Sequence, residues 1–453
     1  MMNGGNTMIE WIVPSLIIAG AAAIPKGKTN DKKIIKEIFE NVGYGIRKKS
    51  GDVLFPKFKK KEVIMDIYIE VIKEDGKDKE VERNVEIGYT YRYSIIPGLP
   101  ATKMKESEEK MKIFADALQK PVEINFGRLH EKDRKTLNIH VYDAEIPTLL
   151  PYETIPKRKD EWVVPLGKSI KGLIWHNFDH IPHMTIAGTT RFGKTVLLRV
   201  LMTYLIECHS EDVEFYIIDL KGGLEFSKYE SIRQVKAVAT DIDESIALLT
   251  YLTNKLPNKK KGEDYGLLEK EYIEFRRKGI SNIVDTDNPK RRFIIVDEGA
   301  QLAPDTYMEA SDKAKLISCQ SKLSRLAAVG GALGWRLLFA TQYPTSDTLP
   351  RQIKQNSDAK ITFRLPSGYA SDVAIDAHGA EELPSNVKGR ALFKTHELKE
   401  MQVPYLTHDQ MWDRLEEYQI PITRTIDVDP INVVEQDESP DDTPDIPHID
   451  LFK

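Results

Sequence analysis

Residues 188–195 are Gly-Thr-Thr-Arg-Phe-Gly-Lys-Thr, which matches the phosphate-loop pattern G-x-x-x-x-G-K-T. In this pattern the glycines let backbone N–H groups face the phosphates, the lysine contacts the β- and γ-phosphate oxygens, and the threonine hydroxyl binds Mg²⁺. We therefore predict ATP and Mg²⁺ as cofactors and Lys194 as a catalytic residue. The residues expected to bind the nucleotide are Gly188, Thr189, Thr190, Arg191, Phe192, Gly193, Lys194 and Thr195.

A phosphate loop that uses a metal also needs a carboxylate, and the stretch 293–298 (FIIVDE) provides two. Ligands bind at the carboxyl ends of parallel strands in open α/β sheets, which is where Asp297 and Glu298 are expected. We predict that Asp297, with Thr195, holds Mg²⁺ and that Glu298 orients and deprotonates the attacking water. The alternative is a surface Asp-Glu pair that only ends a strand.

A second polar pair, Thr341-Gln342, follows the apolar run 335–340. At the tip of the strand that follows the acidic one in the sequence, such a pair can hydrogen-bond the γ-phosphate or the attacking water. It can then report hydrolysis to the rest of the subunit, so Gln342 is a further candidate catalytic residue. In the alternative interpretation Gln342 merely caps the strand.

These side chains need a sheet to bring them together. The run 184–187 before the loop and the runs 214–218, 293–296 and 335–340 are apolar enough for buried strands, and 196–206 has the length and composition of a buried helix. The predicted fold class is α/β, with a RecA-like P-loop NTPase core. It has a mostly parallel sheet, helices on both faces, and a small α+β domain before it.

Several stretches resemble, in the same order, the FtsK/SpoIIIE family of hexameric double-stranded DNA translocases. They are residues 166–195, 217–230, 272–302, 334–367 and 378–394. The resemblance implies an ATP hydrolase that moves double-stranded DNA through a homo-hexameric ring. In ring ATPases a neighbouring subunit usually supplies an arginine to the γ-phosphate, and the candidates for it are Arg325, Arg351 and Arg364.

The resemblance also reaches upstream of the motor. A helix with Met111, Phe114, Ala115 and Leu118 on one face and strands around 122–124 and 137–141 resemble the family's small α domain. The expected domains are a short N-terminal apolar segment at 1–28, a small α+β domain at 29–150, the motor at 151–406, and a C-terminal extension at 407–453.

The sequence departs from the family in two respects. Arg191 and Phe192 stand where the family usually has Gly and Ser, and the chain after residue 394 leaves no room for the winged-helix module that reads oriented DNA. We interpret the protein as an accessory motor of a plasmid or integrative element, such as a conjugative coupling protein, with a relaxase as a candidate partner. Alternatives are a protein-secretion motor, although those usually carry several P-loop modules, and a membrane-bound regulatory NTPase without DNA.

The two ends of the chain differ in charge. Residues 11–25 are apolar and uncharged but shorter than the roughly 20 residues that span a bilayer, and many lysines follow them. The hypothesis is a short membrane anchor with a cytoplasmic motor, and the alternative is a buried or interfacial helix. The segment 427–450 is acidic, contains no Lys or Arg, and is predicted to be disordered.

The overall composition neither requires nor excludes a nucleic-acid partner, because the net charge of -5 does not describe a local channel. Cys208 and Cys319 form no metal or disulfide pattern. Several basic residues of the motor are candidates for DNA phosphate contacts, with solvated helix faces as the alternative. They are Lys259, Lys260, Lys261, Arg276, Arg277, Lys278, Lys322, Arg325, Arg351 and Lys354.

Overall fold

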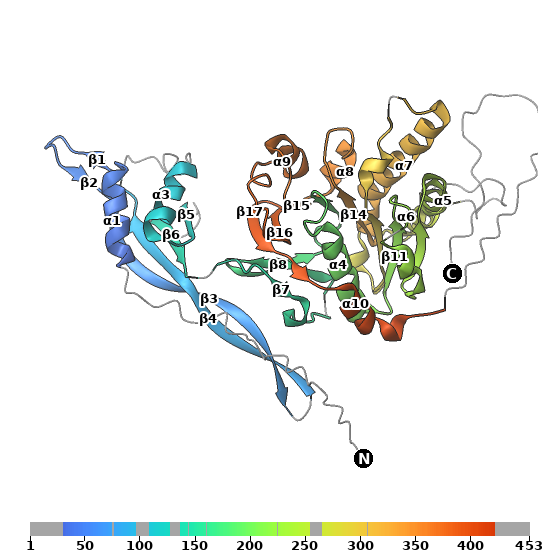
Figure 1. The fold of residues 1–453 in the computed structure, drawn as a ribbon, viewed down its shortest axis with the longest axis horizontal. Helices are drawn as coiled ribbons and strands as arrows, with labels where there is room; N and C mark the ends of the chain where they lie inside the picture. The colour runs from blue at the N-terminus through green and yellow to red at the C-terminus, as the bar shows by residue number, and fades with distance from the viewer. Residues whose placement is uncertain are drawn as a thin grey trace, which may run out of the picture. The chain divides into compact units, whose positions relative to one another are not determined.

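The computed structural model describes residues 30–74, 77–96, 108–126, 136–143, 145–159, 161–223, 225–253, 265–305 and 307–421 of the 453-residue chain (Figure 1). They form two compact units: one contains the residues up to 64 and from 87 to 143, and the other contains 65–86 and the residues from 144 onward. The segments 11–25 and 427–450 and the lysines at 259–261 lie outside the described residues. Within the described ranges no helix is long and apolar enough to cross a membrane.

The first unit contains both helices and strands. Its helices are α1 (Asp31–Asn41) and α3 (Glu108–Leu118), and its short strands β1 (Ile46–Arg47) and β2 (Val53–Leu54) pair with each other. A four-stranded sheet has the order β3-β4-β6-β5, with β3 (Lys57–Glu74), β4 (Lys77–Ser94), β5 (Val122–Phe126) and β6 (Thr136–Tyr142). Residues 65–74 of β3 and 77–86 of β4 belong to the second unit. The helix and the strands expected in the stretch 111–141 are therefore confirmed.

Helix α1 was not predicted, because its lysines were interpreted as the flank of a membrane segment. In the structure these lysines are exposed, whereas Ile35, Ile38 and Phe39 on the same helix are buried. Phe39 packs edge-to-face on Phe114 and Tyr93, with ring centroids 5.8 and 5.1 Å apart. The basic stretch is thus amphipathic, and its apolar face helps to build this domain's core.

The second unit contains a ten-stranded sheet in the order β12-β11-β13-β14-β10-β15-β16-β17-β8-β9. The run from β12 to β15 is parallel, and the remaining strands are antiparallel. The strands are β8 (Val163–Ser169), β9 (Gly172–Asn177), β10 (Met184–Ala187), β11 (Val213–Ile218), β12 (Val235–Ala239), β13 (Arg291–Val296), β14 (Trp335–Thr341), β15 (Ala359–Phe363), β16 (Arg390–Lys394) and β17 (Leu398–Gln402). This confirms the predicted mostly parallel α/β core, in which β14 lies between the loop strand β10 and the acidic strand β13.

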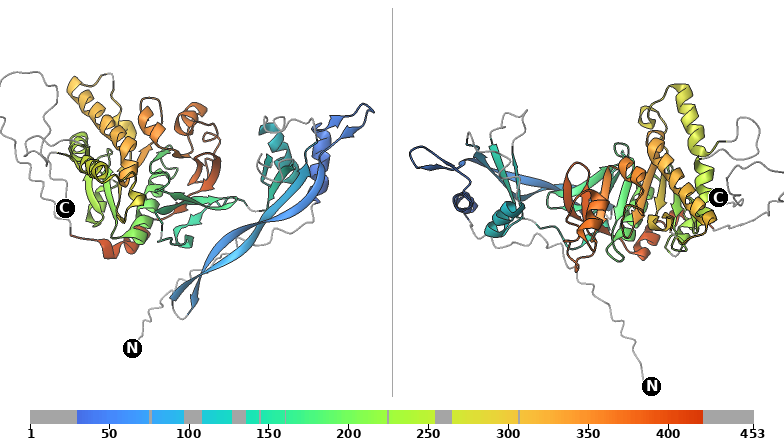
Figure 2. Two further views of the ribbon diagram at one scale, coloured as in Figure 1. Left: turned by 180° about the vertical axis from the view of Figure 1, so that it is seen from behind. Right: turned by 90° about the horizontal axis from the view of Figure 1, so that it is seen from above.

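Helices cover both faces of this sheet (Figure 2). Successive side chains of a strand point to opposite faces, so Phe293 and Ile295 pack with helix α4, whereas Ile294 and Val296 pack with α5 and α7. This two-sided burial explains why the parallel strands are continuously apolar. The helices are α4 (Lys194–His209), α5 (Ile242–Thr253), α6 (Leu267–Lys278), α7 (Ala310–Val329), α8 (Arg351–Asn356), α9 (Gly368–Ile375) and α10 (His408–Arg414).

At the N-terminal ends of β13 and β14, the partly buried Asp179 and two buried arginines form an ion cluster. Asp179 accepts hydrogen bonds from Arg291 at both carboxylate oxygens, 2.7 and 3.0 Å away, and from Arg336 at 2.6 Å. The Arg336 guanidinium also donates to the carbonyls of Gly331 and Trp335. Burial acts to raise the pKa of Asp179, but the hydrogen bonds and charges of the two arginines lower it.

Replacing this carboxylate should destabilise the motor. Asp179→Ala leaves the Arg336 side chain, 1% exposed, without its counter-ion, so we expect the free energy of unfolding to fall by about 3–5 kcal/mol in urea denaturation. Asp179 stabilises the fold above its unfolded-state pKa, and this contribution is lost as pH falls through the lowered folded-state pKa. The difference in the free energy of unfolding between wild type and variant should therefore become smaller at acidic pH.

The matched control is Glu269→Ala, which removes the partner of the 43% exposed Arg325. Solvent screens that pair, so its loss should cost less than about 1 kcal/mol. Equal losses in the two variants would contradict a structural role for the ion cluster.

Candidate active site

The phosphate loop curls tightly over strand β15. Gly188 and Gly193 have φ of 156° and 123°, and a Cβ atom on them would lie 2.6 and 2.9 Å from Phe363. The Gly188 N–H donates to the Thr341 carbonyl at 3.2 Å, and Thr189 donates to the Arg364 carbonyl through its N–H and its hydroxyl, at 3.2 and 3.0 Å. Only glycine fits both positions, as the motif requires.

The two unusual residues of the loop have distinct surroundings. Arg191 is exposed, has a positive φ of 71°, and lines the cleft beside the loop. Phe192 is half-buried, with the Lys388 ammonium 4.1 Å from its ring centroid, and its carbonyl accepts a hydrogen bond from the Gly389 N–H at 3.0 Å. Phe192 thus attaches the loop to residues 388–389, and the Arg191 side chain is left at the mouth of the cleft.

Lys194 connects the loop to the acidic strand. Its ammonium donates to the Asp297 carbonyl at 2.8 Å and to Glu298 Oε2 at 3.3 Å, and it is 3.9 Å from Asp297 Oδ1. The Lys194 side chain is only 5% exposed, and burial lowers its pKa although the charges of Asp297 and Glu298 act in the opposite direction. From this buried position the Lys194 ammonium can reach nucleotide phosphates without first becoming exposed to solvent.

The side chains present fit a magnesium ion. Asp297 Oδ1 is buried and accepts no hydrogen bond from any described residue, so this oxygen has a coordination position to spare. The Thr195 side chain lines the same cleft. A carboxylate and a hydroxyl are the hard oxygen donors that Mg²⁺ takes, and nucleotide phosphates and water complete its shell.

Glu298 is oriented by the tip of strand β14. Its Oε1 accepts hydrogen bonds from the Gln342 N–H at 2.9 Å and from the Thr341 hydroxyl at 3.2 Å. The Gln342 side chain in turn accepts a hydrogen bond from the Thr190 hydroxyl at 3.1 Å. The structure therefore brings together the residues that the sequence proposed. They are the phosphate loop, the acid pair Asp297 and Glu298, and the pair Thr341 and Gln342.

A second lysine at the acid pair was not assigned from the sequence. Lys221 donates to Asp297 Oδ2 at 2.8 Å, from the loop that follows β11. The signal available in the sequence was its position just after an apolar strand, the same rule that identified Asp297 and Gln342.

The cleft next to the loop has a volume of about 580 Å³, within the range of ligand sites. The phosphate loop, Lys221 and Gln342 line one side, and the segments 386–389, 402–405 and 148–149 line the rest. Leu149 and Tyr405 are largely exposed there and offer apolar surface to a nucleobase. Loop, acids and cleft together can bind a nucleoside triphosphate and hydrolyse it.

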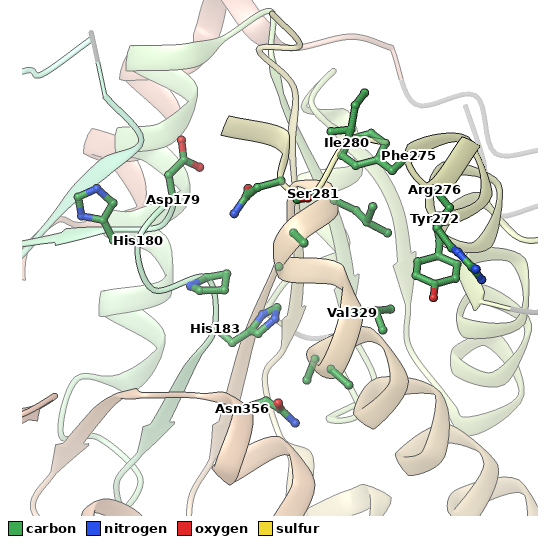
Figure 3. A pocket seen from close by; sticks show the side chains of 17 residues that line it. Asp179, His180, His183, Tyr272, Phe275, Arg276, Ile280, Ser281, Val329 and Asn356 are labelled. Atoms are coloured by element: carbon green, nitrogen blue, oxygen red, sulfur yellow. The ribbon is translucent and has the colours of Figure 1, made fainter. Parts of the chain in front are cut away.

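A second cavity, of about 460 Å³, lies at the opposite edge of the sheet, where β10 and β14 begin (Figure 3). His183, Tyr272, Phe275 and Arg276 are among its lining residues. His183 Nδ1 accepts the Leu337 N–H at 2.9 Å, and burial lowers the pKa of His183 to about 3, so this ring is neutral. The cavity contains neither the phosphate loop nor the acid pair and is separate from the hydrolytic site.

The basic residues proposed from the sequence have different surroundings. Arg325 pairs with Glu269 at 3.0 Å, Lys354 with Asp376 at 2.6 Å, and Lys278 with Glu274 at 2.5 Å. Arg364 donates to the Leu383 carbonyl. Arg276 lies over the Tyr272 ring, Lys322 is half-buried, and Arg277 and Arg351 are exposed.

Comparison with known proteins agrees with this geometry. Residues 149–346 match the FtsK/SpoIIIE family. A DNA translocase FtsK of Streptococcus agalactiae is 26% identical over 341 residues, which is 72% of this chain and 39% of that protein. Another, of Chlorobaculum tepidum, is 27% identical over 265 residues, 54% of this chain and 30% of that protein. This chain therefore spans less than half the length of these curated relatives.

Among solved structures, the pCW3 conjugation coupling protein TcpA, in monomer form with ATPγS, has a TM-score of 0.53. It is 23% identical, and the match covers 86% of this chain and 99% of that one. This likeness supports the fold.

Removing the loop lysine should weaken nucleotide binding. For Lys194→Ala we expect the affinity for ATP with Mg²⁺ to fall at least about tenfold, because charge-assisted hydrogen bonds to the phosphates are lost. Titration with a fluorescent ATP analogue measures the effect. Arg277→Ala, at an exposed position of α6, should bind as the wild type does, and unchanged binding by Lys194→Ala would refute the assignment of this loop.

Proposed function

We propose that this protein hydrolyses ATP to move double-stranded DNA, since residues 149–346 match the FtsK/SpoIIIE family. The observation that carries the proposal is the contact network at the phosphate loop, beside the cleft. Lys194, Asp297, Glu298 and the Thr341-Gln342 pair converge there on the phosphate loop.

In the proposed reaction each residue has a separate role. Lys194 and the backbone of the loop hold the β- and γ-phosphates, and Glu298 accepts a proton from the attacking water. Bound Mg²⁺, held by Thr195 and Asp297, would neutralise charge on the phosphates. Because the Gln342 N–H and the Thr341 hydroxyl orient Glu298, the tip of β14 follows the state of the γ-phosphate.

We further propose that the motor works as a homo-hexamer, in which a neighbouring subunit supplies an arginine to the γ-phosphate. Arg351 is the best of the candidates. It is exposed at the start of α8 and makes no ion pair or hydrogen bond through its guanidinium within the described part of the chain. Arg325 and Arg364, in contrast, are held by Glu269 and by the Leu383 carbonyl.

The proposed setting is plasmid or conjugative DNA transfer, with a relaxase or another transfer protein as partner. Support comes from relatives named DNA translocases and from the fold shared with a conjugation coupling protein. The apolar segment 11–25, with Lys26 and Lys28 directly after it, is the part of the sequence suited to tether the motor to the cell membrane from the cytoplasmic side.

The DNA proposal predicts stimulation of ATP hydrolysis. Long duplex DNA should raise the steady-state ATPase rate several-fold, and the effect should decline as salt rises because phosphate contacts release counter-ions. Coupled-enzyme assays with long duplex, short duplex and no DNA measure this, with Lys194→Ala as the inactive control. An unchanged rate in a wild-type protein with basal activity would favour protein secretion or a regulatory NTPase instead.

The proposed base predicts a separation of binding from hydrolysis. Glu298→Gln can still accept the Gln342 N–H but cannot take a proton, so turnover should fall by about 10²–10⁴-fold while ATP binding persists. Rapid filtration of bound ATP together with phosphate release distinguishes the two steps. Normal turnover in this variant would mean that another residue activates the water.

A further inference from the structure

Two ammonium groups, and not one, lie against the acid pair. Lys221 Nζ is 2.8 Å from Asp297 Oδ2 and 3.5 Å from Glu298 Oε2. Lys194 Nζ is 3.3 Å from the same Glu298 oxygen. The phosphate-loop motif accounts for Lys194 but assigns nothing to Lys221.

The loop that carries Lys221 is fixed by a buried carboxylate. Asp219 is fully buried, and its Oδ1 accepts the Lys221 N–H at 3.2 Å. Its Oδ2 accepts the N–H groups of Glu225 and Phe226 at 3.2 and 3.1 Å. The backbone on both sides of the turn is therefore held, and Lys221 projects into the cleft that it lines together with the phosphate loop.

The charges of the site explain what this second cation can do. Two carboxylates, Asp297 and Glu298, thus face two ammonium groups, those of Lys194 and Lys221. The two ammonium groups contact one shared Glu298 oxygen. A phosphoryl oxygen that replaces this carboxylate oxygen beside Lys194 therefore also comes within reach of Lys221.

The Lys221 side chain is 30% exposed, so it can shift between partners, whereas Lys194 is almost fully buried. ADP lacks the phosphoryl group that would enter this position. A cation that contacts only the γ-phosphate strengthens the binding of ATP and leaves that of ADP nearly unchanged.

We propose that Lys221 is a γ-phosphate-binding residue that makes the site select ATP over ADP. This inference rests on the proposed nucleotide site. Before ATP binds, Asp297 and Glu298 hold the Lys221 ammonium. When ATP binds, the ammonium exchanges Glu298 Oε2 for the γ-phosphate and keeps its hydrogen bond to Asp297 Oδ2, which leaves Asp297 Oδ1 available to the metal's water shell.

The test compares two nucleotides in one variant. Lys221→Met keeps the length of the side chain and removes its charge. With Mg²⁺ present, its affinity for ATPγS should fall roughly tenfold or more, and its affinity for ADP should change less than about threefold. Isothermal titration calorimetry of the full chain measures both constants, and their ratio is a readout that a purely structural role would not move.

Controls keep the outcomes distinct. Lys228→Met, at an exposed position of the same segment, should bind both nucleotides as the wild type does, and Lys221→Gln should repeat the selective loss. Thermal unfolding without nucleotide checks that each variant is folded. An equal loss for both nucleotides, or no loss, overturns the inference.

No DNA is present in this experiment, so a failure of the translocation proposal leaves the result intact. If the wild type bound neither ATPγS nor ADP, the proposed nucleotide site itself would fail, and the inference with it.

Discussion

Two buried carboxylates side by side at the edge of a sheet impose the constraint on which the motor unit depends. Asp297 and Glu298 are 1% and 4% exposed, and unpaired charges in such a place cost several kcal/mol each. Their cations come from Lys194, at the start of the helix after β10, and from Lys221, in the loop after β11. Because both lysines must reach one point, β10, β11 and β13 have to be parallel and end at the same edge.

The sequence was most informative where a buried strand ends in a polar residue. Asp297, Glu298 and Gln342 each follow an apolar run, and the parallel arrangement brings their ends together, so local patterns sufficed. Lys221 shares this position, but its partner Asp297 is 76 residues away, and nothing in the local sequence identifies that partner. Contacts of this range depend on strand order, which a hydrophobic pattern does not contain.

The same limit explains what else was missed. Helix α1 carries a basic face that composition alone attributed to a membrane flank, and only the packing of Phe39 on Phe114 distinguishes the two interpretations. Phe192, a departure from the family, has its place because Lys388, far along the chain, covers its ring. In both cases, contacts between residues far apart in the sequence determine the environment of the side chain, and the local sequence does not contain them.

The ion cluster around Asp179 gives the sheet two unequal ends. Arg291 and Arg336, both buried, fix the first residues of β13 and β14 through charge-assisted hydrogen bonds to the partly buried Asp179. The other ends of these strands meet Glu298 and its lysine partners, which in our proposal exchange contacts when the γ-phosphate binds. The starts of β13 and β14 are therefore held more firmly than their carboxyl ends. We expect that displacement caused by the proposed nucleotide chemistry occurs at the carboxyl ends and not in the core.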